Sequence, residues 1–433
     1  MTQRNDEKYR SRKPTTKTDC TDDEIHKLVD SDVFCIIPWI HIHSFPDGRA
    51  LPCCVADDRY PIGDAQTDSL KDIWNQKPLR DIRVNMLADT PCKECATCYE
   101  QEKTGFFSPR NSANHHLGHN IGLVKDTKDD GTVEDFVMRY YDIRFSNLCN
   151  MRCRICGPVH SNQWHKEDVE LFKTPIKSNG GLDQVGRHDT DMIDQLWPHI
   201  PYLEQVYFAG GEPLIMPEHY IIIDELVKRE QFTTRLSYNT NMSIIDYKGH
   251  SILEKWKLFT NVYVGASLDG EGARAEYMRK RTQWDKIVRN REKMMSVCPN
   301  VSFTVSCTVS IYNILSMTDF HRSWADKGLI RPAQWNCNIL QSPDRDRIDV
   351  LPDYFKEQAI EKIEEHIEWL RPLDDWHHSV NGYEGVLKFL KQDNYNKDVL
   401  GEFIKYNDRL DGSREESFDD TFPELTGLRD YVN

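Results

Sequence analysis

The sequence lacks features that would place it in several large classes of protein. Its 433 residues contain no run of about 18 apolar residues, so we expect no membrane-spanning segment. The first 20 residues are basic and polar but have no apolar stretch, so they do not resemble a secretory signal and favour a cytoplasmic location. The chain also lacks positive charge, because 70 acidic residues outnumber 55 basic ones and the formal net charge is −15. This balance disfavours nucleic acid as a partner, since such binding depends on Lys and Arg contacts to phosphates.

The cysteines are the most informative residue type that is present. There are 13 of them. In a reducing compartment, clustered thiols more often bind metal or carry out redox chemistry than form disulfides. Most of them gather into two groups, one before residue 100 and one near residue 150. The sequence therefore predicts two metal sites.

Composition and hydrophobic pattern divide the chain into five segments. Residues 1–31 are expected to be a disordered basic tail, residues 32–104 a Cys-rich module, and residues 105–133 a linker. Residues 134–345 alternate strands with helices, and residues 346–433 are predicted to be helical and acidic. From Val350 onward, 20 acidic and 10 basic residues carry −10 of the net charge, which leaves −5 for the rest of the chain.

Short apolar segments separated by helical ones fill residues 134–345. Six of them are expected to be strands: VMRYYDIRF, EQVYFAG, RLSYNT, VYVGASL, VSFTVSCTV and QWNCNIL. Strands that alternate with helices favour βα units and a parallel sheet. The predicted fold class is α/β, with a partial (β/α)6 TIM-like barrel, a small N-terminal hairpin-plus-helix module and a helical acidic C-terminal extension. We expect the chemistry at the C-terminal ends of the strands.

The Cys-rich module reads as a hairpin followed by helices. FCIIPWIHIHSF is expected to be a strand, Pro46–Gly48 a turn, and RALPCCV the returning strand. Helical spacing continues through residues 69–87, and Pro78 is expected to separate two short helices. A loop then carries PCKECATC. His41 and His43, two residues apart on the first strand, point to the same face, where a packing role is favoured over a role beside a metal site.

The first βα loop carries three cysteines at C-x3-C-x2-C, namely Cys149, Cys153 and Cys156. Three thiolates in a tight loop suit an iron–sulfur cube that keeps one iron open for a substrate or cofactor. A zinc site would accept the same spacing, so spacing alone leaves both metals open.

Motifs on the following strands add to this loop. AGGEP ends the second strand, SYNTN the third and ASLDG the fourth, and EYMRK follows. Together with the cysteine spacing they resemble the radical SAM superfamily over residues 134–340. The family splits S-adenosylmethionine (SAM) reductively at a [4Fe–4S] cluster.

The resemblance implies roles for particular residues. Cys149, Cys153 and Cys156 would hold the SAM-binding cluster, which makes them both metal ligands and catalytic. Candidates for contacts to SAM or substrate are Gly210, Gly211, Glu212, Pro213, Asn239, Asn241, Ser267, Asp269 and Arg279. A residue that is often aromatic in the family is Ile155 here, which removes a stacking contact to adenine.

The earlier cysteines resemble the auxiliary-cluster modules called SPASM and Twitch, which carry a hairpin with two cysteines and a later C-x2-C. That resemblance implies a second [4Fe–4S] cluster in a single-cluster, Twitch-like form, held by Cys35, Cys53, Cys95 and Cys98. Cys54 or Cys92 could replace a neighbour, and zinc stays open as the metal. The module usually follows the barrel in the family, whereas here it precedes it.

The function implied by the resemblance is a radical SAM enzyme that forms a 5′-deoxyadenosyl radical and abstracts hydrogen from a peptide, a protein or a small polar substrate. A flavodoxin- or ferredoxin-like protein would donate the electron. The alternatives are a non-catalytic zinc-binding scaffold and an RNA-modifying radical SAM enzyme, although the chain has no obvious basic patch. Four arginines near the predicted site leave room for a small anionic substrate: Arg144, Arg152, Arg154 and Arg279.

Overall fold

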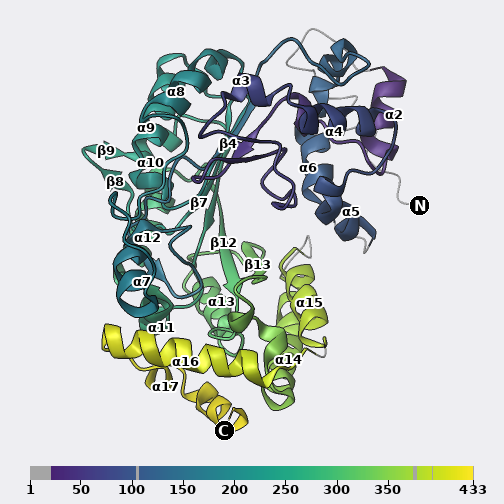
Figure 1. The fold of residues 1–433 in the computed structure, drawn as a ribbon. Coiled ribbons are helices and arrows are strands. Elements are labelled where there is room, and N and C mark those ends of the chain that lie inside the picture. Colours follow the sequence, from purple (N-terminus) through teal and green to yellow (C-terminus); the bar gives the residue numbers. More distant parts are fainter. Residues whose placement is uncertain (1–20, 104–106, 374–377, 393, 433) are drawn as a thin grey trace. The chain divides into compact units, whose positions relative to one another are not determined.

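The strands predicted from apolar runs form the framework of the molecule (Figure 1). The computed structural model describes residues 21–103, 107–373, 378–392 and 394–432. The chain divides into two units. The first comprises the residues up to Asn147 with Asp183–Gly210 and Met216–Leu236, and the second comprises Leu148–Leu182, Gly211–Ile215 and Ser237–Asn433.

All six strands predicted for the barrel are present, in the predicted chain order. They are β4 (Tyr140–Ile143), β6 (Gln205–Phe208), β7 (Arg235–Thr240), β10 (Val262–Ala266), β12 (Ser302–Val309) and β13 (Trp335–Ile339). The pairs β4–β6, β10–β12 and β12–β13 are parallel. The α/β prediction with a mostly parallel sheet is therefore confirmed.

In the first unit, the hairpin of the Cys-rich module joins the first barrel strand. Strand β1 (His43–Ser44) pairs antiparallel with β2 (Arg49–Leu51), which pairs with β3 (Gly63–Asp64). On its other side β1 runs parallel to β4, with His43 opposite Asp142. The module thus adds strands to the edge of β4 instead of folding apart from it.

The predicted hairpin is confirmed, but its first strand is shorter than expected. The turn closes as Gly48 N–H donates to the carbonyl of Phe45. Gly48 has a left-handed φ of 93°, and a Cβ there would lie 2.4 Å from Asp64 Oδ1. Most of FCIIPWIHIHSF is not strand, because Ile37–Trp39 forms a 3₁₀ helix with Pro38 in its first turn. Proline lacks the N–H that a strand needs and suits the first turn of a helix.

The helices around Pro78 agree with the sequence. Helix α3 (Leu70–Ile73) begins at a Ser69 capping box, and α4 (Lys77–Leu87) begins with Pro78 in its first turn. The barrel segments of this unit contribute α8 (Asp191–Leu196), a 3₁₀ helix at Trp197–Tyr202 and α9 (Pro217–Lys228).

Three segments of the first unit are more ordered than expected. Helix α2 (Asp22–Asp30) lies within the predicted tail, and residues 1–20 lie outside the described residues. PCKECATC is not a loop, since it forms a 3₁₀ helix at Lys93–Cys95 and the start of α5 (Ala96–Lys103). The predicted linker contains α6 (Pro109–Leu117) and a 3₁₀ helix at Gly118–Asp126. Polar residues of α6 are buried here, since Asn114 bonds the backbone of Ile36, Leu28 and Phe34.

In the second unit, helices follow the strands as the βα pattern predicts. They are α7 (His165–Phe172), α10 (Ile252–Trp256), α11 (Gly272–Met278), α12 (Trp284–Val297) and α13 (Met317–Asp326). Two short antiparallel pairs accompany them: β8 (Asp246–Tyr247) with β9 (His250–Ser251), and β5 (Arg152–Cys153) with β11 (Arg279–Lys280). Short 3₁₀ helices lie at Asn162–Trp164, Pro213–Ile215, Asp344–Asp346 and Ile348–Val350.

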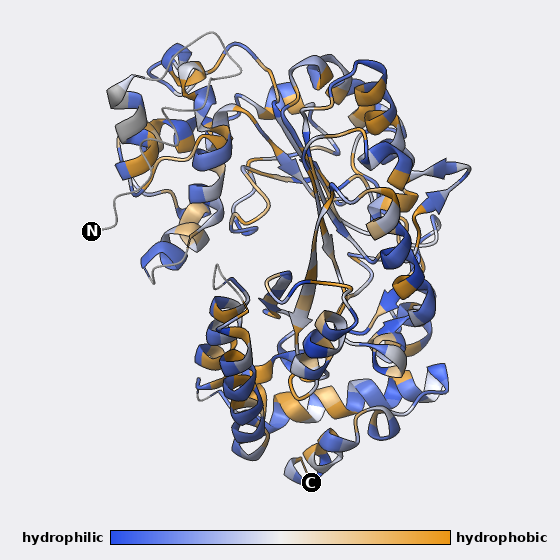
Figure 2. Cartoon of the chain, turned by 180° about the vertical axis from the view of Figure 1, so that it is seen from behind, coloured by the Kyte–Doolittle hydropathy of each residue, from blue (hydrophilic) through white to orange (hydrophobic). Residues whose placement is uncertain are grey.

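The C-terminal region is helical, as predicted. It contains α14 (Asp353–Leu370), α15 (His378–Leu390), α16 (Lys397–Arg414), α17 (Phe418–Thr421) and a 3₁₀ helix at Pro423–Tyr431. Helix α14 buries Phe355, Ile363, Ile367 and Leu370 and half-buries Ile360. Figure 2 shows hydrophobic and hydrophilic residues on opposite sides of these helices, the pattern of helices that pack on a core. Within the described residues, no helix combines the length and the apolar character that a membrane span requires.

Strand β12 provides a test of the core. Phe303 is 1% exposed, whereas its neighbour Ser302 is exposed. We expect Phe303→Ala to lower the free energy of unfolding by about 3–5 kcal/mol, because it removes a large buried side chain and leaves a cavity. Ser302→Ala should change it by less than about 0.5 kcal/mol. Anoxic urea denaturation followed by tryptophan fluorescence measures both, and equal losses would contradict the assignment of Phe303 to the core.

Candidate functional site

The backbone of the loop that carries Cys149, Cys153 and Cys156 is held by side chains of residues 161–164. The N–H of Cys149 donates to Asn162 Oδ1 at 3.1 Å, and Trp164 Nε1 donates to the carbonyl of Cys153 at 3.1 Å. Ser161 Oγ donates to the carbonyl of Met151 at 2.7 Å. These contacts come from the segment directly after the loop and fix its path.

The three thiols of this loop converge. Cys149 and Cys153 are buried with Met151, and Cys156 packs against them. All three are free cysteines. A hydrogen bond from Cys156 lowers the pKa of Cys153, and burial raises the pKa of Cys149 to about 12. Three free thiols in one place fit a cluster that takes three cysteine ligands.

Glu212 of the AGGEP motif binds the loop after β7. Its Oε1 accepts from Thr240 Oγ1 at 2.7 Å and from the N–H of Leu214 at 3.1 Å, and its Oε2 accepts from the N–H of Asn241 at 2.8 Å. Burial raises the pKa of Glu212 to about 7, although these hydrogen bonds oppose the shift. Glu212 therefore joins two predicted motifs, AGGEP and SYNTN.

Asn241 continues this connection to the cysteine loop. Its Nδ2 donates to Asn150 Oδ1 at 2.9 Å, and its Oδ1 accepts from Ser243 Oγ at 2.6 Å. Asn150 Nδ2 in turn donates to Ser243 Oγ at 2.8 Å. Asn239, also a candidate, has an exposed side chain on β7. The amide at Asn241 therefore holds the Cys149 loop against the end of β7.

The ASLDG motif reaches the same loop through an arginine. Arg279 donates from Nε and Nη2 to Asp269 Oδ2, both at 2.8 Å, and its Nη1 lies 3.7 Å from Cys153 Sγ. Asp269 Oδ1 also accepts from the N–H of Thr308 at 2.9 Å. Ser267 is half-buried and donates its N–H to the carbonyl of Thr240 at 2.8 Å. Asp269 thus orients Arg279 toward the thiols.

The remaining candidates of the AGGEP motif lie in a tight turn. Pro213 begins a buried 3₁₀ helix at Pro213–Ile215. Gly210, in the first unit, has a left-handed φ of 92°, and a Cβ there would lie 3.3 Å from the side chain of Arg144. This φ suits glycine and disfavours other residues at this position.

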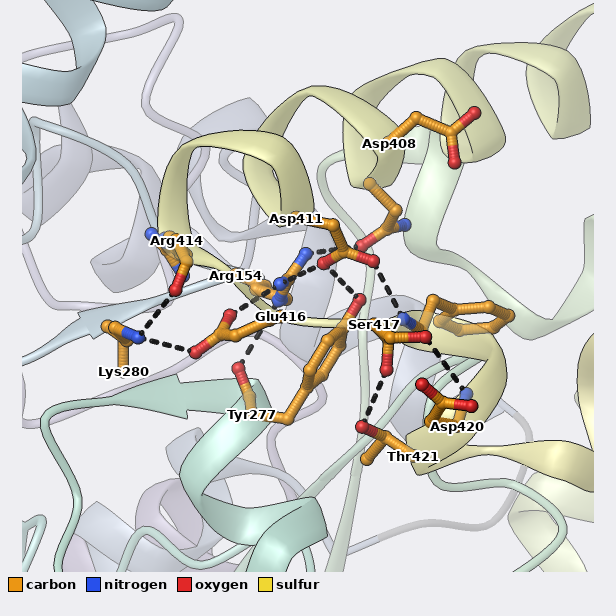
Figure 3. Close-up of polar contacts among 12 residues, drawn as sticks. Arg154, Tyr277, Lys280, Asp408, Asp411, Arg414, Glu416, Ser417, Asp420 and Thr421 are labelled. Carbon is orange, nitrogen blue, oxygen red and sulfur yellow. Dashed lines mark hydrogen bonds and ion pairs between the residues drawn. The ribbon is translucent and has the colours of Figure 1, made fainter.

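A buried arginine in the cysteine loop connects it to the C-terminal helices (Figure 3). Arg154 is fully buried, and its Nη2 pairs with Asp411 Oδ1 at 2.5 Å and Glu416 Oε2 at 2.7 Å. Its Nη1 donates to Asn407 Oδ1 at 2.9 Å, and its guanidinium lies 3.6 Å from the ring centre of Tyr277. Asp411 also accepts from Tyr277 Oη at 2.9 Å.

Two further arginines of the second unit, Arg152 and Arg414, share one carboxylate. Glu167 accepts from Arg414 at 2.7 Å and pairs with Arg152 at 2.9 Å. Lys280 Nζ pairs with Glu416 at 2.7 Å. The C-terminal extension therefore contacts β11 through Lys280, and through Arg154 it contacts the residue that directly follows β5.

These pairs correct the expectation that four arginines are available to an anionic substrate. Arg152, Arg154 and Arg279 each pair with a carboxylate in the second unit, and Arg144 pairs with Asp142 at 3.0 Å in the first. Only the partners of Arg154 lie far away in the sequence, 257 residues in the case of Asp411, whereas Arg144, Arg152 and Arg279 pair with carboxylates that are close to them along the chain. The sequence analysis missed Asp411, Glu416, Arg414 and Glu167, and the one available signal was the excess of acidic residues after Val350.

The first unit contains a second cysteine site. A cavity of about 180 Å³ is lined by Cys35, Cys53, Cys54, Cys95 and Cys98. Burial raises the pKa of Cys53 to about 12 and that of Cys98 above its usual value. The four predicted ligands thus share one cavity, as a four-cysteine cluster requires.

The two alternative ligands differ in position. Cys92 does not line the cavity, and its Sγ donates weakly to the carbonyl of Ile82 at 3.7 Å. Cys54 does line the cavity, but it also interacts with the carboxylate of Asp142. The geometry therefore favours Cys95 over Cys92 as a cluster ligand. Cys54 has Asp142 as a second neighbour, outside the cysteine group.

Two family models match the regions of the chain that contain the two cysteine sites. The model of the Radical SAM superfamily matches residues 143–320, and that of an iron–sulfur cluster-binding domain, SPASM, matches residues 35–99. Among solved structures, the chain is similar to native anSMEcpe with bound AdoMet and Cp18Cys peptide, at 15% identity over 55% of this chain and 60% of that one, with a TM-score of 0.36. Native anSMEcpe with bound AdoMet gives 16% identity, 55% and 61% coverage and a TM-score of 0.36. No curated protein sequence matches the chain.

The chain therefore contains a radical SAM superfamily domain at residues 143–320. More particularly, an auxiliary iron–sulfur cluster-binding module at residues 35–99 precedes that domain in the sequence. The two matches imply a [4Fe–4S] cluster and SAM for the radical SAM domain and further iron–sulfur for the module, which favours iron–sulfur over zinc at the second cysteine site. The chain spans about 60% of the length of the anSMEcpe structures.

The contacts of Arg154 predict a strong dependence of the cysteine loop on α16 and Glu416. In the double variant Asp411→Asn, Glu416→Gln, the buried guanidinium of Arg154 loses both anionic partners. This should lower the free energy of unfolding by about 3–5 kcal/mol. We expect this variant to retain the iron of its first module but to lose most of the iron held by the Cys149 loop. Iron analysis and the EPR spectrum after reduction with SAM measure the loss.

A matched control lies on the same helix. Asp408, which pairs with the partly exposed Arg429, points away from this network (Figure 3). Asp408→Asn should keep the full iron content, because an exposed ion pair contributes little. An unchanged iron content in the double variant would show that the loop does not depend on these carboxylates.

Proposed function

We propose that the chain binds a [4Fe–4S] cluster through Cys149, Cys153 and Cys156 and uses SAM to abstract hydrogen from a peptide, a protein or a small polar substrate. The observation that carries the proposal is the convergence of three free thiols with Glu212, Asn241 and Arg279 inside one unit. Each of these residues lies within the stretch that matches the radical SAM superfamily.

When bound, the reduced cluster and SAM together supply the 5′-deoxyadenosyl radical as the hydrogen-abstracting species. The chain positions this chemistry and shields it from water. Glu212 and Asn241 hold the AGGEP and SYNTN turns against the cysteine loop, which fixes the backbone of the turns that would bind SAM. Arg279 places a positive charge beside the thiol of Cys153, which favours its thiolate, the form that binds iron.

Cys35, Cys53, Cys95 and Cys98 are proposed to hold the second cluster as a full set of four. With no iron left open, this cluster suits electron transfer better than substrate binding. An electron accepted from the substrate would make the net reaction an oxidation. A flavodoxin- or ferredoxin-like protein is the proposed source of the electron for SAM cleavage.

A peptide is one of the proposed substrate classes, by analogy with other proteins that carry such modules. A cytoplasmic location is proposed as well, because the 12 described cysteines are all free, as in a reducing compartment. Nucleic acid is not among the proposed substrates, since the net charge is −15 and the four arginines near the cysteine loop and β4 are paired with carboxylates.

Cysteine variants separate the two clusters. We expect the reconstituted protein to hold about eight irons per chain, two cubes of four. The double variant Cys149→Ala, Cys153→Ala should lose about four of them and form no 5′-deoxyadenosine from SAM with dithionite. The double variant Cys35→Ala, Cys53→Ala should also lose about four irons yet still form 5′-deoxyadenosine.

Cys298→Ser is the control, because Cys298 is buried outside both sites. This variant should keep the iron content and the formation of 5′-deoxyadenosine of the wild type. Stoichiometric zinc in place of iron, or 5′-deoxyadenosine formed without Cys149 and Cys153, would contradict the proposal.

The substrate can be sought by isotope transfer. Reconstituted protein incubated with a deuterium-labelled cell extract should give deuterated 5′-deoxyadenosine, since the hydrogen comes from the substrate. Fractionation into peptides and small molecules before incubation should place the deuterium donor in one of these two fractions, as mass spectrometry of the nucleoside can show. Deuterium transfer only from the nucleic acid fraction would contradict the proposed substrate class.

A further inference from the structure

Two histidines and an aspartate meet in the interior of the first unit, outside both sets of cysteine ligands. His41, His43 and Asp142 are fully buried. One nitrogen of each ring and one carboxylate oxygen lie within 4.8 Å of one another. His43 and Asp142 are also paired across the parallel β1–β4 ladder, so the backbone itself brings them together.

The backbone fixes the protonation of both rings. His41 Nδ1 lies 3.0 Å from the carbonyl oxygen of Tyr140, and His43 Nδ1 lies 2.8 Å from that of Asp142. A carbonyl oxygen only accepts, so each Nδ1 carries a proton, and in a neutral ring the Nε2 then presents a lone pair. Neither Nε2 has a hydrogen-bond partner among the described residues, although both are buried. Burial also lowers the pKa of His41 to about 4, which keeps that ring neutral.

The carboxylate of Asp142 is oriented by a neighbouring cation. Its Oδ1 lies 3.0 Å from Arg144 Nη2, and its Oδ2 lies 3.3 Å from His43 Nδ1. Burial works to raise the pKa of Asp142, but the positive charge of Arg144 and the interaction with His43 outweigh burial and keep the pKa below its usual value. Asp142 is therefore an anion that directs one oxygen toward the histidines.

We propose that His41, His43 and Asp142 bind one divalent transition-metal ion of the zinc or ferrous class, separate from the two iron–sulfur sites. Two neutral imidazoles and one carboxylate are a common ligand set for these ions. Ligating histidines typically donate their other N–H to a backbone carbonyl, as both of these do, and ligating carboxylates are themselves held by outer partners, as Asp142 is by Arg144. An ion would also satisfy buried lone pairs that are costly to leave unpaired.

The proposed ion site lies next to the cysteine cavity that is proposed to hold the auxiliary cluster. Cys54 lines the cysteine cavity and also interacts with the carboxylate of Asp142, and Tyr140, whose carbonyl holds His41, lines the same cavity. The proposed ion therefore lies beside the auxiliary cluster, where its charge would stabilise added electrons on that cluster.

Cobalt(II) provides a direct test, because it substitutes for zinc and its high-spin EPR signal is distinct from the diamagnetic resting [4Fe–4S] cubes. Holoprotein with both clusters is passed over a chelating resin and dialysed without oxygen against cobalt(II). We expect about one cobalt per chain in the wild type. His43→Gln and Asp142→Asn should each weaken binding about tenfold or more, and the double variant His41→Gln, His43→Gln should bind none.

Two comparisons keep the test independent of folding. The iron content of every variant is measured first, because an intact complement of iron shows that both clusters have assembled. His188→Gln, which changes an exposed histidine of the same unit, should bind cobalt as the wild type does. No cobalt in the wild type, or equal cobalt in the double histidine variant, would show that ordered water alone fills this site.

Discussion

The organisation of the second unit depends on one buried positive charge. Arg154 lies between Cys153 and Cys156 in a loop in which Cys149 and Cys153 are buried and Cys156 is partly buried, and its guanidinium has no access to water. A cation can stay in such a place only with anions and hydrogen-bond acceptors around it. Asp411, Glu416 and Asn407 provide them from the C-terminal region. The acidic extension is thus part of the structure that holds the cysteine loop.

The same principle recurs at smaller scale around the cysteine loop. Glu167 is shared by Arg152 and Arg414, and Asp269 holds Arg279 beside Cys153. Glu212 has hydrogen bonds to two backbone N–H groups and a hydroxyl. Each carboxylate joins segments that are distant in the sequence, so the loop is fixed from several directions. Such preorganisation is what a cofactor needs if a reactive species is to be held away from water.

The sequence predicted the strands well because apolar runs are a local pattern, and in β12 the buried residues alternate with more exposed ones as a strand requires. It also placed the four auxiliary cysteines, which line one cavity. It predicted a loop at PCKECATC and a linker after residue 104, where the structure has helices. Those segments are polar, and their helices are stabilised by partners such as Ile36 for Asn114 that no local pattern reveals. The ion pairs of Arg154 were missed for the same reason, since their partners are more than 250 residues away.

The distance between Arg154 and its partners has a consequence for how the protein is made. Asp411 is synthesised 257 residues after Arg154. At about 5–20 residues per second, roughly 13–50 seconds of translation separate the two. During that interval the cysteine loop has no counter-charge to bury its arginine and must remain hydrated and open. A metal delivered to the nascent chain would meet thiols that are not yet shielded, so correct loading of the first cluster favours delivery after residue 416 has emerged.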